Sequence, residues 1–323
     1  MSRIIVAGHI CLDITPVFPG GKEYSDLSEA LFPGKLVNVG EAKIHLGGCV
    51  SNTGLALKML GSDVELLGKV GDDEFGKTIE NELARYGCGG LIVDKECTTS
   101  YSVVVAVPGI DRIFLHNPGA NDSFYASDIP DSVFDGASMF HFGYPPLMKS
   151  MYADNGFELQ KIMKRAKDNG MTTSLDMSYV EKGSPSAAAD WDAILGRALP
   201  YVDYFLPSFE EASAMLGDIT DVEAIADRCL AYGAKTVVIK CGTGGMFYKT
   251  GDKKGRQDAF KAPFVASATG AGDVSIAAFL MAVQRGDSLE KAVALACAEG
   301  CCSVMAYDSL SGLKPLEELE KMI

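Results

Sequence analysis

The stretch Ser267-Ala268-Thr269-Gly270-Ala271-Gly272-Asp273 leads into an apolar pattern with helical spacing, so its glycines lie where a loop becomes a helix. Free N–H groups at such a junction attract anions, and small residues let a phosphate approach the backbone closely. Asp273 would place a carboxylate beside this anion site, where it could accept the proton of an attacking hydroxyl. The stretch therefore indicates phosphoryl transfer to an alcohol. A simpler interpretation is a helix start capped by Thr269, and the rest of the chain has to decide between the two.

The composition narrows the function class. The chain has 323 residues, of which 47% are hydrophobic, and a formal net charge of -14. Nucleic-acid-binding proteins normally carry a basic patch, whereas the run Lys253-Lys254-Gly255-Arg256 is typical of a solvated loop, so we expect no nucleic-acid partner. No apolar run is long enough to span a membrane, and residues 1–8 predict a strand rather than a signal peptide. We therefore expect no membrane partner and a cytoplasmic location.

Short β-rich runs alternate with helical patterns along the chain. The expected strands are Ile4–His9, Val64–Val70, Met139–Phe142, Thr172–Asp176, Tyr204–Leu206 and Thr236–Lys240. The expected helices include Ser51–Leu60, Phe75–Tyr86, Asn155–Asp168, Val222–Tyr232 and Asp273–Gln284. This alternation predicts an α/β fold whose central, mainly parallel sheet is covered by helices on both faces. In such sheets, ligands bind beyond the carboxyl ends of the strands.

Two stretches interrupt this alternation. Residues 14–45 contain no convincing helix, and residues 98–121 contain the β-rich runs Tyr101–Val107 and Arg112–His116 around a Pro-Gly turn, which is typical of a hairpin. We expect both stretches to form a small β lid on a single domain that spans residues 1–323. Exposed lid strands often pair with another subunit, which suggests a homodimer through Val103–Val107.

The segment Gly71-Asp72-Asp73-Glu74-Phe75-Gly76-Lys77-Thr78 has the letters of a phosphate-binding P-loop. Three consecutive acidic residues would then face the phosphate oxygens, and like charges repel. We therefore interpret the segment as a strand end, a turn and a helix start, with the acidic residues near the positive end of the helix.

Polar and glycine-rich segments follow two of the later strands. Ser208 and Glu211 have the spacing of a capping box, but Glu211 could also hold Mg²⁺ through water at the carboxyl edge of the sheet. The segment Lys240-Cys241-Gly242-Thr243-Gly244-Gly245 could accommodate a nucleotide or simply form a turn.

A second group of residues lies nearer the N-terminus. Gly47 and Gly48, with Asn52, precede a helical pattern, and they could bring the backbone to a polar ligand or form a plain turn. Asp13 and Asp176 each follow a strand. Each could be a cap or turn residue, but both at the carboxyl side of the sheet would suit hydrogen bonds to sugar hydroxyls.

In chain order, these motifs resemble those of the ribokinase-like (PfkB) carbohydrate kinases, and the resemblance covers nearly the whole chain. The residues that carry it are Asp13, Gly47-Gly48 with Asn52, Gly68 to Gly76, Ser208 to Glu211, Lys240 with Gly242 and Gly245, and Thr269 to Asp273. The resemblance also explains the false P-loop, because the segment from Gly68 to Gly76 is typical of the family.

The resemblance implies a three-layer α/β/α core with a β lid, and ATP-dependent phosphorylation of a hydroxymethyl group. It implies that Asp273 is the catalytic base and that the amides of Gly270, Ala271 and Gly272 stabilise the transferring charge. Substrate hydroxyls would be held by Asp13, Gly47, Gly48 and Asn52, joined by Asp176 at its strand end. ATP would lie near Ser208, Lys240, Gly242, Thr243 and Gly245, and Glu211 would help to organise Mg²⁺.

Three positions depart from the family pattern. Ser267 and Ala268 stand where the family usually has Asp-Thr, and because that Asp often helps to bind a monovalent cation, potassium (K⁺) activation stays open. Ser275 replaces the usual Phe two residues after the base, and Ser208 replaces the Asn of the N-x-x-E motif. A serine can still donate a hydrogen bond, although it has fewer groups than an amide.

The sequence therefore predicts a sugar kinase that uses Mg·ATP and takes a small, fructose- or ribose-like sugar. A nucleoside kinase is the nearest alternative, and it would need apolar or aromatic walls around a base, which the lid segments could supply. A non-catalytic sugar- or nucleotide-sensing protein on the same fold is a third reading, because a fold alone does not guarantee activity.

Overall fold

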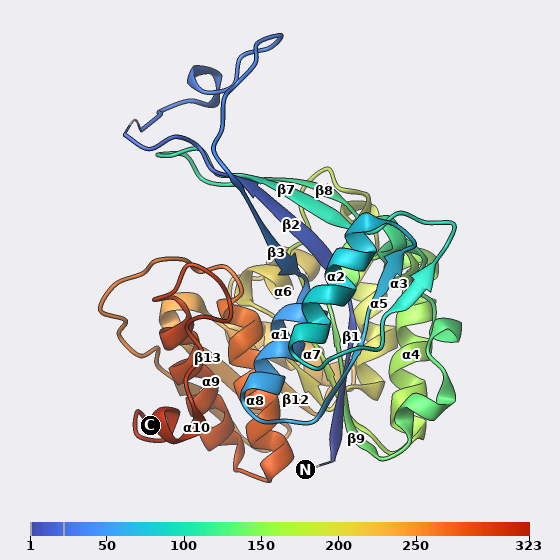
Figure 1. Cartoon of the computed structure of the whole chain (residues 1–323). Helices are drawn as coiled ribbons and strands as arrows, with labels where there is room; N and C mark the ends of the chain where they lie inside the picture. Colours follow the sequence, from blue (N-terminus) through green and yellow to red (C-terminus); the bar gives the residue numbers. More distant parts are fainter. Residues whose placement is uncertain (1, 22) are drawn as a thin grey trace.

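A computed structural model describes residues 2–21 and 23–323 of the chain. Its centre is a large sheet in the order β14-β13-β12-β11-β10-β9-β1-β4 (Figure 1). The pairs β12–β13 and β13–β14 are antiparallel, and the other pairs are parallel. The strands are β1 (Arg3–Gly8), β4 (Val64–Leu67), β9 (Ala137–Gly143), β10 (Thr172–Leu175), β11 (Tyr204–Phe205), β12 (Thr236–Lys240), β13 (Met246–Thr250) and β14 (Lys254–Gln257). The predicted, mainly parallel sheet is confirmed.

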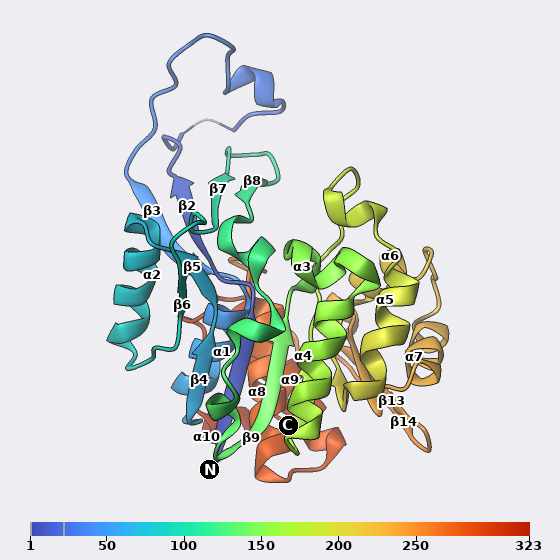
Figure 2. The same ribbon diagram turned by 90° about the vertical axis from the view of Figure 1, so that its right-hand side faces the viewer.

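Helices cover both faces of this sheet (Figure 2). One apolar cluster contains α1 (Cys49–Met59), α2 (Glu74–Arg85), α8 (Ala271–Arg285), α9 (Leu289–Ser303) and α10 (Leu316–Leu319). The other contains α3 (Lys149–Tyr152), α4 (Phe157–Asp168), α5 (Trp191–Ala198), α6 (Phe209–Met215) and α7 (Val222–Ala231). Successive side chains of β1 point to opposite faces of the sheet: Ile4 and Val6 belong to the first cluster, whereas Ile5 and Ala7 belong to the second. The molecule thus has the three layers expected of an α/β/α core.

Short 3₁₀-helices connect several of these elements. They are η1 (Leu27–Glu29), η2 (Gly119–Ser123), η3 (Ala126–Asp128), η4 (Asp131–Phe134), η5 (Pro145–Leu147), η6 (Ala153–Asn155), η7 (Pro185–Ala188), η8 (Leu199–Tyr201) and η9 (Gly242–Gly244). Within the described ranges, no helix is long and apolar enough to cross a membrane.

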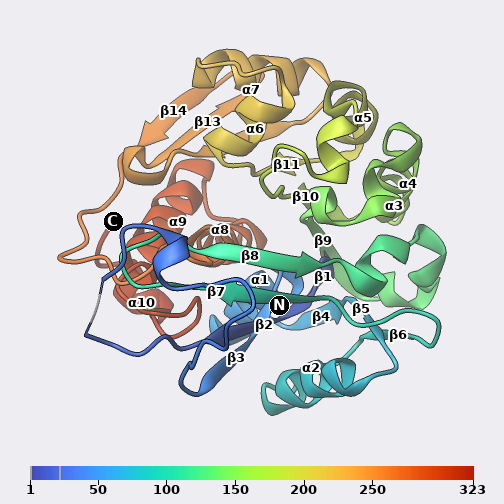
Figure 3. The same cartoon turned by 90° about the horizontal axis from the view of Figure 1, so that it is seen from above.

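A smaller sheet lies beyond the carboxyl ends of the parallel strands, as Figure 3 shows from above. We call it the lid sheet, and its strand order is β3 (Ala42–Gly47), β2 (Cys11–Pro16), β7 (Tyr101–Val105) and β8 (Ile113–Asn117). The predicted hairpin is confirmed, because β7 and β8 are antiparallel with Val103 opposite Leu115. Between β2 and β3, the described residues contain no helix other than the single turn η1.

The predicted strand Val64–Val70 is wrong as a single element. It is divided at Gly68, because β4 pairs with β1 in the large sheet whereas β5 (Lys69–Gly71) pairs with β6 (Ile92–Asp94). A Cβ at Gly68 would lie 2.6 Å from Cγ2 of Ile10. The chain can change sheets there because glycine permits this close approach.

Three helix starts also differ from the prediction by two residues, and the first is that of α1, which begins at Cys49 rather than Ser51. Helix α8 begins at Ala271, so Asp273 lies within its first turn rather than at its start. Helix α4 begins at Phe157 rather than Asn155, because Asn155 and Gly156 both have positive φ, 51° and 76°. The segment that resembles a P-loop forms the expected turn and helix start: Asp73 caps α2 and accepts the Gly76 N–H at 2.9 Å.

The predicted dimer contact through Val103–Val107 is also wrong. Strand β7 is an inner strand, because it pairs with β8 along Tyr101–Val105 and with β2 at Tyr101–Val103. Within the described lid sheet, the edge strands are β3 and β8. An edge-to-edge contact between two lids would therefore have to use one of these strands.

Candidate active site

At the half-buried start of α8, the Ala271 N–H donates to the carbonyl oxygen of Ala268 at 3.3 Å, whereas Gly270 and Gly272 bring further backbone donors to the cavity. The N-cap of the helix is Gly270, whose φ of 75° is readily adopted only by glycine, and no described side chain caps the helix. Thr269, which the sequence offered as an alternative N-cap, precedes the observed N-cap by one residue, so it does not cap α8. A Cβ at Gly270 would also lie 2.3 Å from Cβ of Ser309, so the loop and the C-terminal segment pack closely here. The result is a half-buried helix N-terminus with the character of an anion site.

A cavity of about 800 Å³ lies in front of this helix start. It brings together most of the residues that the sequence singled out, although they come from distant parts of the chain. Those that line it are Asp176, Ser208, Glu211, Lys240, Gly242, Thr243, Gly245, Gly270, Ala271, Gly272 and Asp273. The apolar side chains of Phe260, Val265 and Val304 line it as well.

The remaining predicted residues lie together at the base of the lid sheet. Asp13 is on β2, and Cys11 donates to its Oδ1 at 3.4 Å. A Cβ at Gly47 would lie 2.6 Å from Oδ2 of Asp13, and a Cβ at Gly48 would lie 2.5 Å from the carbonyl oxygen of His9. Both glycines are therefore required by close packing, and neither they nor Asp13 lines the large cavity.

The carboxylate of Asp273 is buried, with 3% of the residue exposed, and is held by side chains from two other elements. Tyr144 donates to both carboxylate oxygens at 2.8 Å. Asn52 donates to Oδ2 at 3.0 Å and Thr53 to Oδ1 at 3.3 Å, both from α1. Ser309 donates to Oδ1 of Asn52 at 3.1 Å, which fixes the amide. Burial raises the pKa of Asp273, and these donors oppose the rise by stabilising the charged form.

Lys240 and Asp176 form a buried ion pair in the same cavity. The distance from Nζ to Oδ1 is 2.6 Å, and Asp176 is 1% exposed. Burial alone would lower the pKa of Lys240, but the carboxylates of Asp176 and Glu211 raise it above its usual value, so the ammonium stays charged. A Cβ at Gly272 would lie 3.8 Å from Nζ of Lys240. A fixed positive charge therefore stands beside the open end of α8.

Ser208 and Glu211 form the capping box that their spacing predicts. The Ser208 hydroxyl accepts the Glu211 N–H at 3.2 Å, and the Glu211 carboxylate accepts the Ser208 N–H at 2.6 Å. Burial raises the pKa of Glu211. The structural interpretation is thus confirmed, but the same two side chains also line the cavity, so their capping role does not exclude contact with a ligand.

Sequence reasoning missed several residues at this site. Tyr144 directly follows β9, at the same kind of strand end that drew attention to Asp176. Thr53 is fully buried in α1 and carries no sequence signal. Arg112, beside the turn of the lid hairpin, donates to the hydroxyl of Thr269 in the loop before α8. The lid sheet therefore contacts the loop that precedes the anion site.

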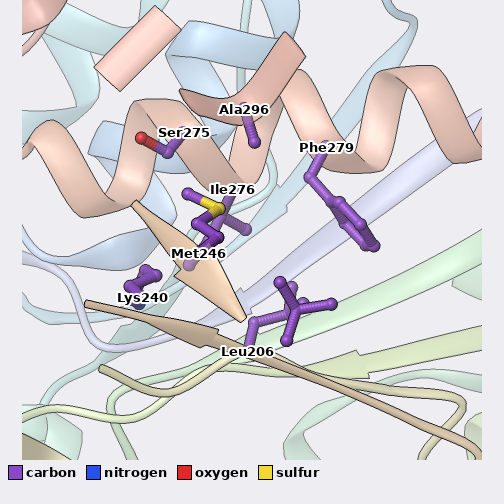
Figure 4. A pocket seen from close by; sticks show the side chains of 8 residues that line it. Leu206, Lys240, Met246, Ser275, Ile276, Phe279 and Ala296 are labelled. Carbon is purple, nitrogen blue, oxygen red and sulfur yellow. The ribbon is translucent and has the colours of Figure 1, made fainter. Parts of the chain in front are cut away.

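A small void of about 10 Å³ lies behind Lys240, between the sheet and helices α8 and α9 (Figure 4). Leu206, Met246, Ile276 and Phe279 are among the side chains that line it, together with Ser275. The Ser275 hydroxyl donates to the carbonyl oxygen of Ala271 at 2.6 Å. This bond links the residue that departs from the family pattern directly to the first turn of α8.

Comparison with known sequences fits this arrangement. Residues 9–314 match the profile of the pfkB family of carbohydrate kinases. The chain belongs to this family. The pfkB kinase described here is 28% identical over 284 residues to the 2-dehydro-3-deoxygluconokinase of Bacillus subtilis (strain 168), with 86% of each chain covered. It is 28% identical over 248 residues to a fructokinase-2 of Zea mays, covering 75% of this chain and 72% of the relative.

Solved structures show the same fold. The Arabidopsis thaliana ribokinase complexed with ribose and ATP aligns with a TM-score of 0.78 over 99% of this chain and 98% of that chain, at 20% identity. The predicted family and the ribokinase-like fold are thus confirmed. This pfkB kinase is a phosphotransferase that acts on a sugar.

Proposed function

We propose that this pfkB kinase transfers the γ-phosphate of Mg·ATP to a hydroxymethyl group of a small, fructose- or ribose-like sugar. The observation that carries the proposal is that the carboxylate of Asp273 and the open N-terminus of α8 line one cavity. A base and an anion site must lie side by side when a hydroxyl attacks a phosphate.

The cavity suits a nucleotide. Its volume of about 800 Å³ lies in the range of small-molecule and cofactor sites. We assign the terminal phosphate to the amides of Gly270, Ala271 and Gly272, beside the ammonium of Lys240. The nucleotide would extend from there past Ser208, Gly242, Thr243 and Gly245. Because the protein's charge is -14, an anion needs a local attraction, which we assign mainly to the N-terminus of α8, since Lys240 is paired with Asp176.

The donors in the cavity also fit a magnesium ion bound with the nucleotide. Glu211 and Asp176 supply carboxylate oxygens, which are the ligands that Mg²⁺ prefers, often through water. We assign Glu211 the main part, because Asp176 is already paired with Lys240. When bound, Mg²⁺ neutralises charge on the phosphate oxygens.

In the proposed reaction, the hydroxyl oxygen of the sugar forms a bond to the γ-phosphorus while the bond from that phosphorus to the β,γ-bridging oxygen breaks. Asp273 accepts the hydroxyl proton, and ADP leaves with the bond's electron pair. The amides at the start of α8 stabilise the charge that develops on the transferred group. Asn52 and Thr53 keep the carboxylate aimed at the acceptor, since they hold it from α1.

We place the sugar between Asp273 and the base of the lid sheet. Asp13 is the carboxylate there that can accept hydrogen bonds from sugar hydroxyls, and Gly47 and Gly48 keep the backbone close. Asn52 is shared, because its amide already donates to Asp273. Asp176 acts on the sugar less directly, through its bond with Lys240. With the lid sheet closed over the acceptor, water is excluded from the phosphate.

The proposal is tested by measuring ADP release with fructose, ribose, adenosine and 2-dehydro-3-deoxygluconate. We expect turnover with a sugar and a loss of about 10²-fold or more in kcat for Asp273→Asn, because the amide cannot accept the proton. Binding of ATP, measured by calorimetry, should be nearly unchanged in this variant. Unaltered turnover in Asp273→Asn would remove the base from the mechanism.

A nucleoside kinase is the second candidate, and aromatic rings at the base of the lid sheet favour it. The ring centroids of His116 and His9 are 5.3 Å apart, and those of His9 and Tyr144 are 6.2 Å apart. Such rings can stack on a nucleobase. Faster phosphorylation of adenosine than of any sugar in the same panel would select this function. Binding without turnover across the panel would instead indicate the sensing protein.

We also propose that the lid sheets of two copies pair. Strand β8 is an edge strand, and Phe114 and Leu115 on it are 53% and 57% exposed. Adjacent residues of a strand point to opposite faces, so neither face of β8 is covered here. An uncovered apolar edge of this kind is a site for pairing with another strand.

A further inference from the structure

The hydroxyl of Tyr144 bridges the two oxygens of the Asp273 carboxylate. The Tyr144 oxygen is 2.8 Å from each carboxylate oxygen, so the hydroxyl lies midway between the two. A substrate hydroxyl that gives its proton to Asp273 must come within the same hydrogen-bond distance of the same oxygens. In the structure, an O–H group of the protein therefore already occupies a position suited to the acceptor.

Tyr144 differs from the other groups that donate to this carboxylate. Asn52 and Thr53 approach from α1, and neither lines the large cavity, whereas Tyr144 lines it together with Asp273. Among these three donors, Tyr144 alone lines the cavity proposed for the nucleotide, and its ring lies beside His9 at the base of the lid sheet, where we place the sugar. An acceptor that enters from the cavity can replace the Tyr144 hydroxyl without disturbing the bonds from α1.

The backbone at Tyr144 is fixed, so the hydroxyl can leave only by rotation of the side chain. Tyr144 has φ 65° and ψ 40°, a left-handed conformation that is unfavourable for a tyrosine. Its N–H donates to the carbonyl oxygen of Asp176 at 3.3 Å, and Pro145 follows it. A strained and well-tethered residue at such a position is commonly connected with function.

A buried histidine side chain next to the Tyr144 ring has no hydrogen-bond partner among the described residues. His9, whose ring centroid is 6.2 Å from that of Tyr144, is 2% exposed, and neither of its ring nitrogens has a hydrogen-bond partner in the described chain. Burial lowers the pKa of His9 to about 3, so the imidazole is neutral and offers one donor and one acceptor. Buried polar groups are rarely left unpaired, yet the imidazole of His9 retains an unused donor and an unused acceptor beside Tyr144.

We infer that the Tyr144 hydroxyl is a placeholder for the acceptor hydroxyl: it holds Asp273 until the substrate arrives and so keeps water from the base. This inference rests on the proposed kinase function. Without the hydroxyl, a water molecule can donate to Asp273. Its oxygen would then bond to the γ-phosphorus, its proton would pass to Asp273, and the bond to the bridging oxygen would break, giving ADP and phosphate.

The test is Tyr144→Phe, which keeps the ring and removes the hydroxyl. We expect the ratio of ADP release without sugar to kcat with the best substrate of the panel to rise by about 10-fold. Tyr152→Phe is the matched control, since Tyr152 lies on α3 just after the same strand and packs against Trp191 rather than Asp273. It should leave both rates unchanged. Adding Asp273→Asn to Tyr144→Phe should abolish the sugar-independent release.

Two results would overturn the inference. The ratio could stay at its wild-type value, which would make Tyr144 a permanent positioning residue. The sugar-independent release could also persist in the double variant with Asp273→Asn, which would show that the water does not use this base. Failure of the proposed function looks different, because the wild-type protein would then neither bind ATP nor release ADP with any substrate of the panel.

Discussion

Asp273 is 3% exposed, so water contributes little to the solvation of its carboxylate. Burial therefore raises its pKa, and the protein replaces the lost water with donors from Tyr144, Asn52 and Thr53. Each donor stabilises the charged form and brings the pKa back down. The protonation state of the base is thus set by individual hydrogen bonds, which can be removed one at a time.

Thr53→Val removes one of these bonds while keeping the shape of the side chain. Turnover requires the deprotonated carboxylate, so activity is lost as the pH falls through the pKa of Asp273. Because the Thr53 hydroxyl donates to the charged form, its removal should raise this pKa further. We expect the acid limb of the kcat/KM profile to move to higher pH, with a loss of about 3- to 10-fold at the acid end.

The control for this profile is Thr78→Val, whose hydroxyl donates to the carbonyl oxygen of Glu74 in α2. It should leave the acid limb in place. An acid limb that does not move in Thr53→Val would show that Thr53 is merely a packing residue, or that the limb belongs to another group.

The sequence predicted the residues of this site unequally. Asp273 and Lys240 could be found because each lies at the junction of a strand or loop with a glycine-rich segment. Tyr144 could not, since its contact with Asp273 joins positions 129 residues apart and depends on a left-handed backbone that tyrosine rarely adopts. The pairing of Asn52 with Asp273 spans 221 residues and was equally hidden, although Asn52 itself was identified.

Helices α8 and α9 pack so closely beneath the anion site that Gly300 has no room for a side chain. A Cβ there would lie 2.5 Å from Oγ of Ser275, which is itself held by the carbonyl oxygen of Ala271. Gly300→Ala should therefore lower the free energy of unfolding by about 1–3 kcal/mol, as overpacking usually does. It should also lower turnover, because the first turn of α8 has to shift.

Ser275→Ala tests the cause of this loss. Without Oγ, Cβ of residue 275 would lie 3.8 Å from the new methyl group, which is an ordinary van der Waals contact. The double variant Gly300→Ala/Ser275→Ala should recover most of the stability that Gly300→Ala loses, as measured by urea unfolding. Equal losses in the single and double variants would place the strain elsewhere.

Glu299 on α9 is a buried acid that the proposed reaction does not use. Its carboxylate accepts the backbone N–H of Lys314 at 3.3 Å and thereby ties the C-terminal segment to α9. Burial raises its pKa from 4.5 to about 7. The folded protein therefore binds the proton more tightly than the unfolded chain, and this group's contribution to stability falls as the pH rises from about 4.5 to 7.

Glu299→Gln should remove that loss, because the amide is neutral at every pH and its oxygen can still accept the Lys314 N–H. We expect the variant and the wild-type protein to unfold at similar urea concentrations near pH 4.5. At pH 8, the variant should be more stable by up to about 3 kcal/mol, the equivalent of the pKa shift. Glu80→Gln, at an exposed position of α2, is the matched control. A stability difference that does not grow with pH would contradict the prediction.

The sequence correctly predicted the helices and strands whose hydrophobic pattern is long and unbroken. The run Val64–Val70 misled because an apolar segment can serve two sheets in succession, and the sequence does not show that Gly68 meets Ile10 there. The role of Val103–Val107 was wrong for a related reason. Strong β patterns identify a strand but not its place in the sheet, and β7 has a neighbour on each side.

The whole molecule combines a strongly acidic surface with a site for an anion. A formal charge of -14 repels a nucleotide at long range, and salt screens that repulsion over about 10 Å at 0.1 M ionic strength. The buried pair of Lys240 and Asp176 is screened much less. Any attraction for the phosphate of the proposed nucleotide is thus local, at the cavity that the start of α8 and Lys240 both line.

The lid sheet is the part of the molecule whose exposed surface is best explained by a second copy. On the edge strand β8, Ile113, Phe114 and Leu115 are 36%, 53% and 57% exposed, and on the other edge strand Ile44 is 54% exposed. A second lid sheet would pair with the open backbone of β8 and cover these side chains. We expect light scattering to give twice the 34.3 kDa mass of the single chain.

The variant Phe114→Lys/Leu115→Lys should shift the protein to the monomer, because each lysine would be placed in the pairing surface and like charges would face each other across it. Phe157→Lys is the control, since Phe157 is 51% exposed on α4, away from the lid sheet. Because Asp13 and the hairpin that carries Arg112 belong to the same sheet, loss of the dimer should also raise KM for the sugar. A monomeric mass for the wild-type protein at all concentrations would rule out the paired lids.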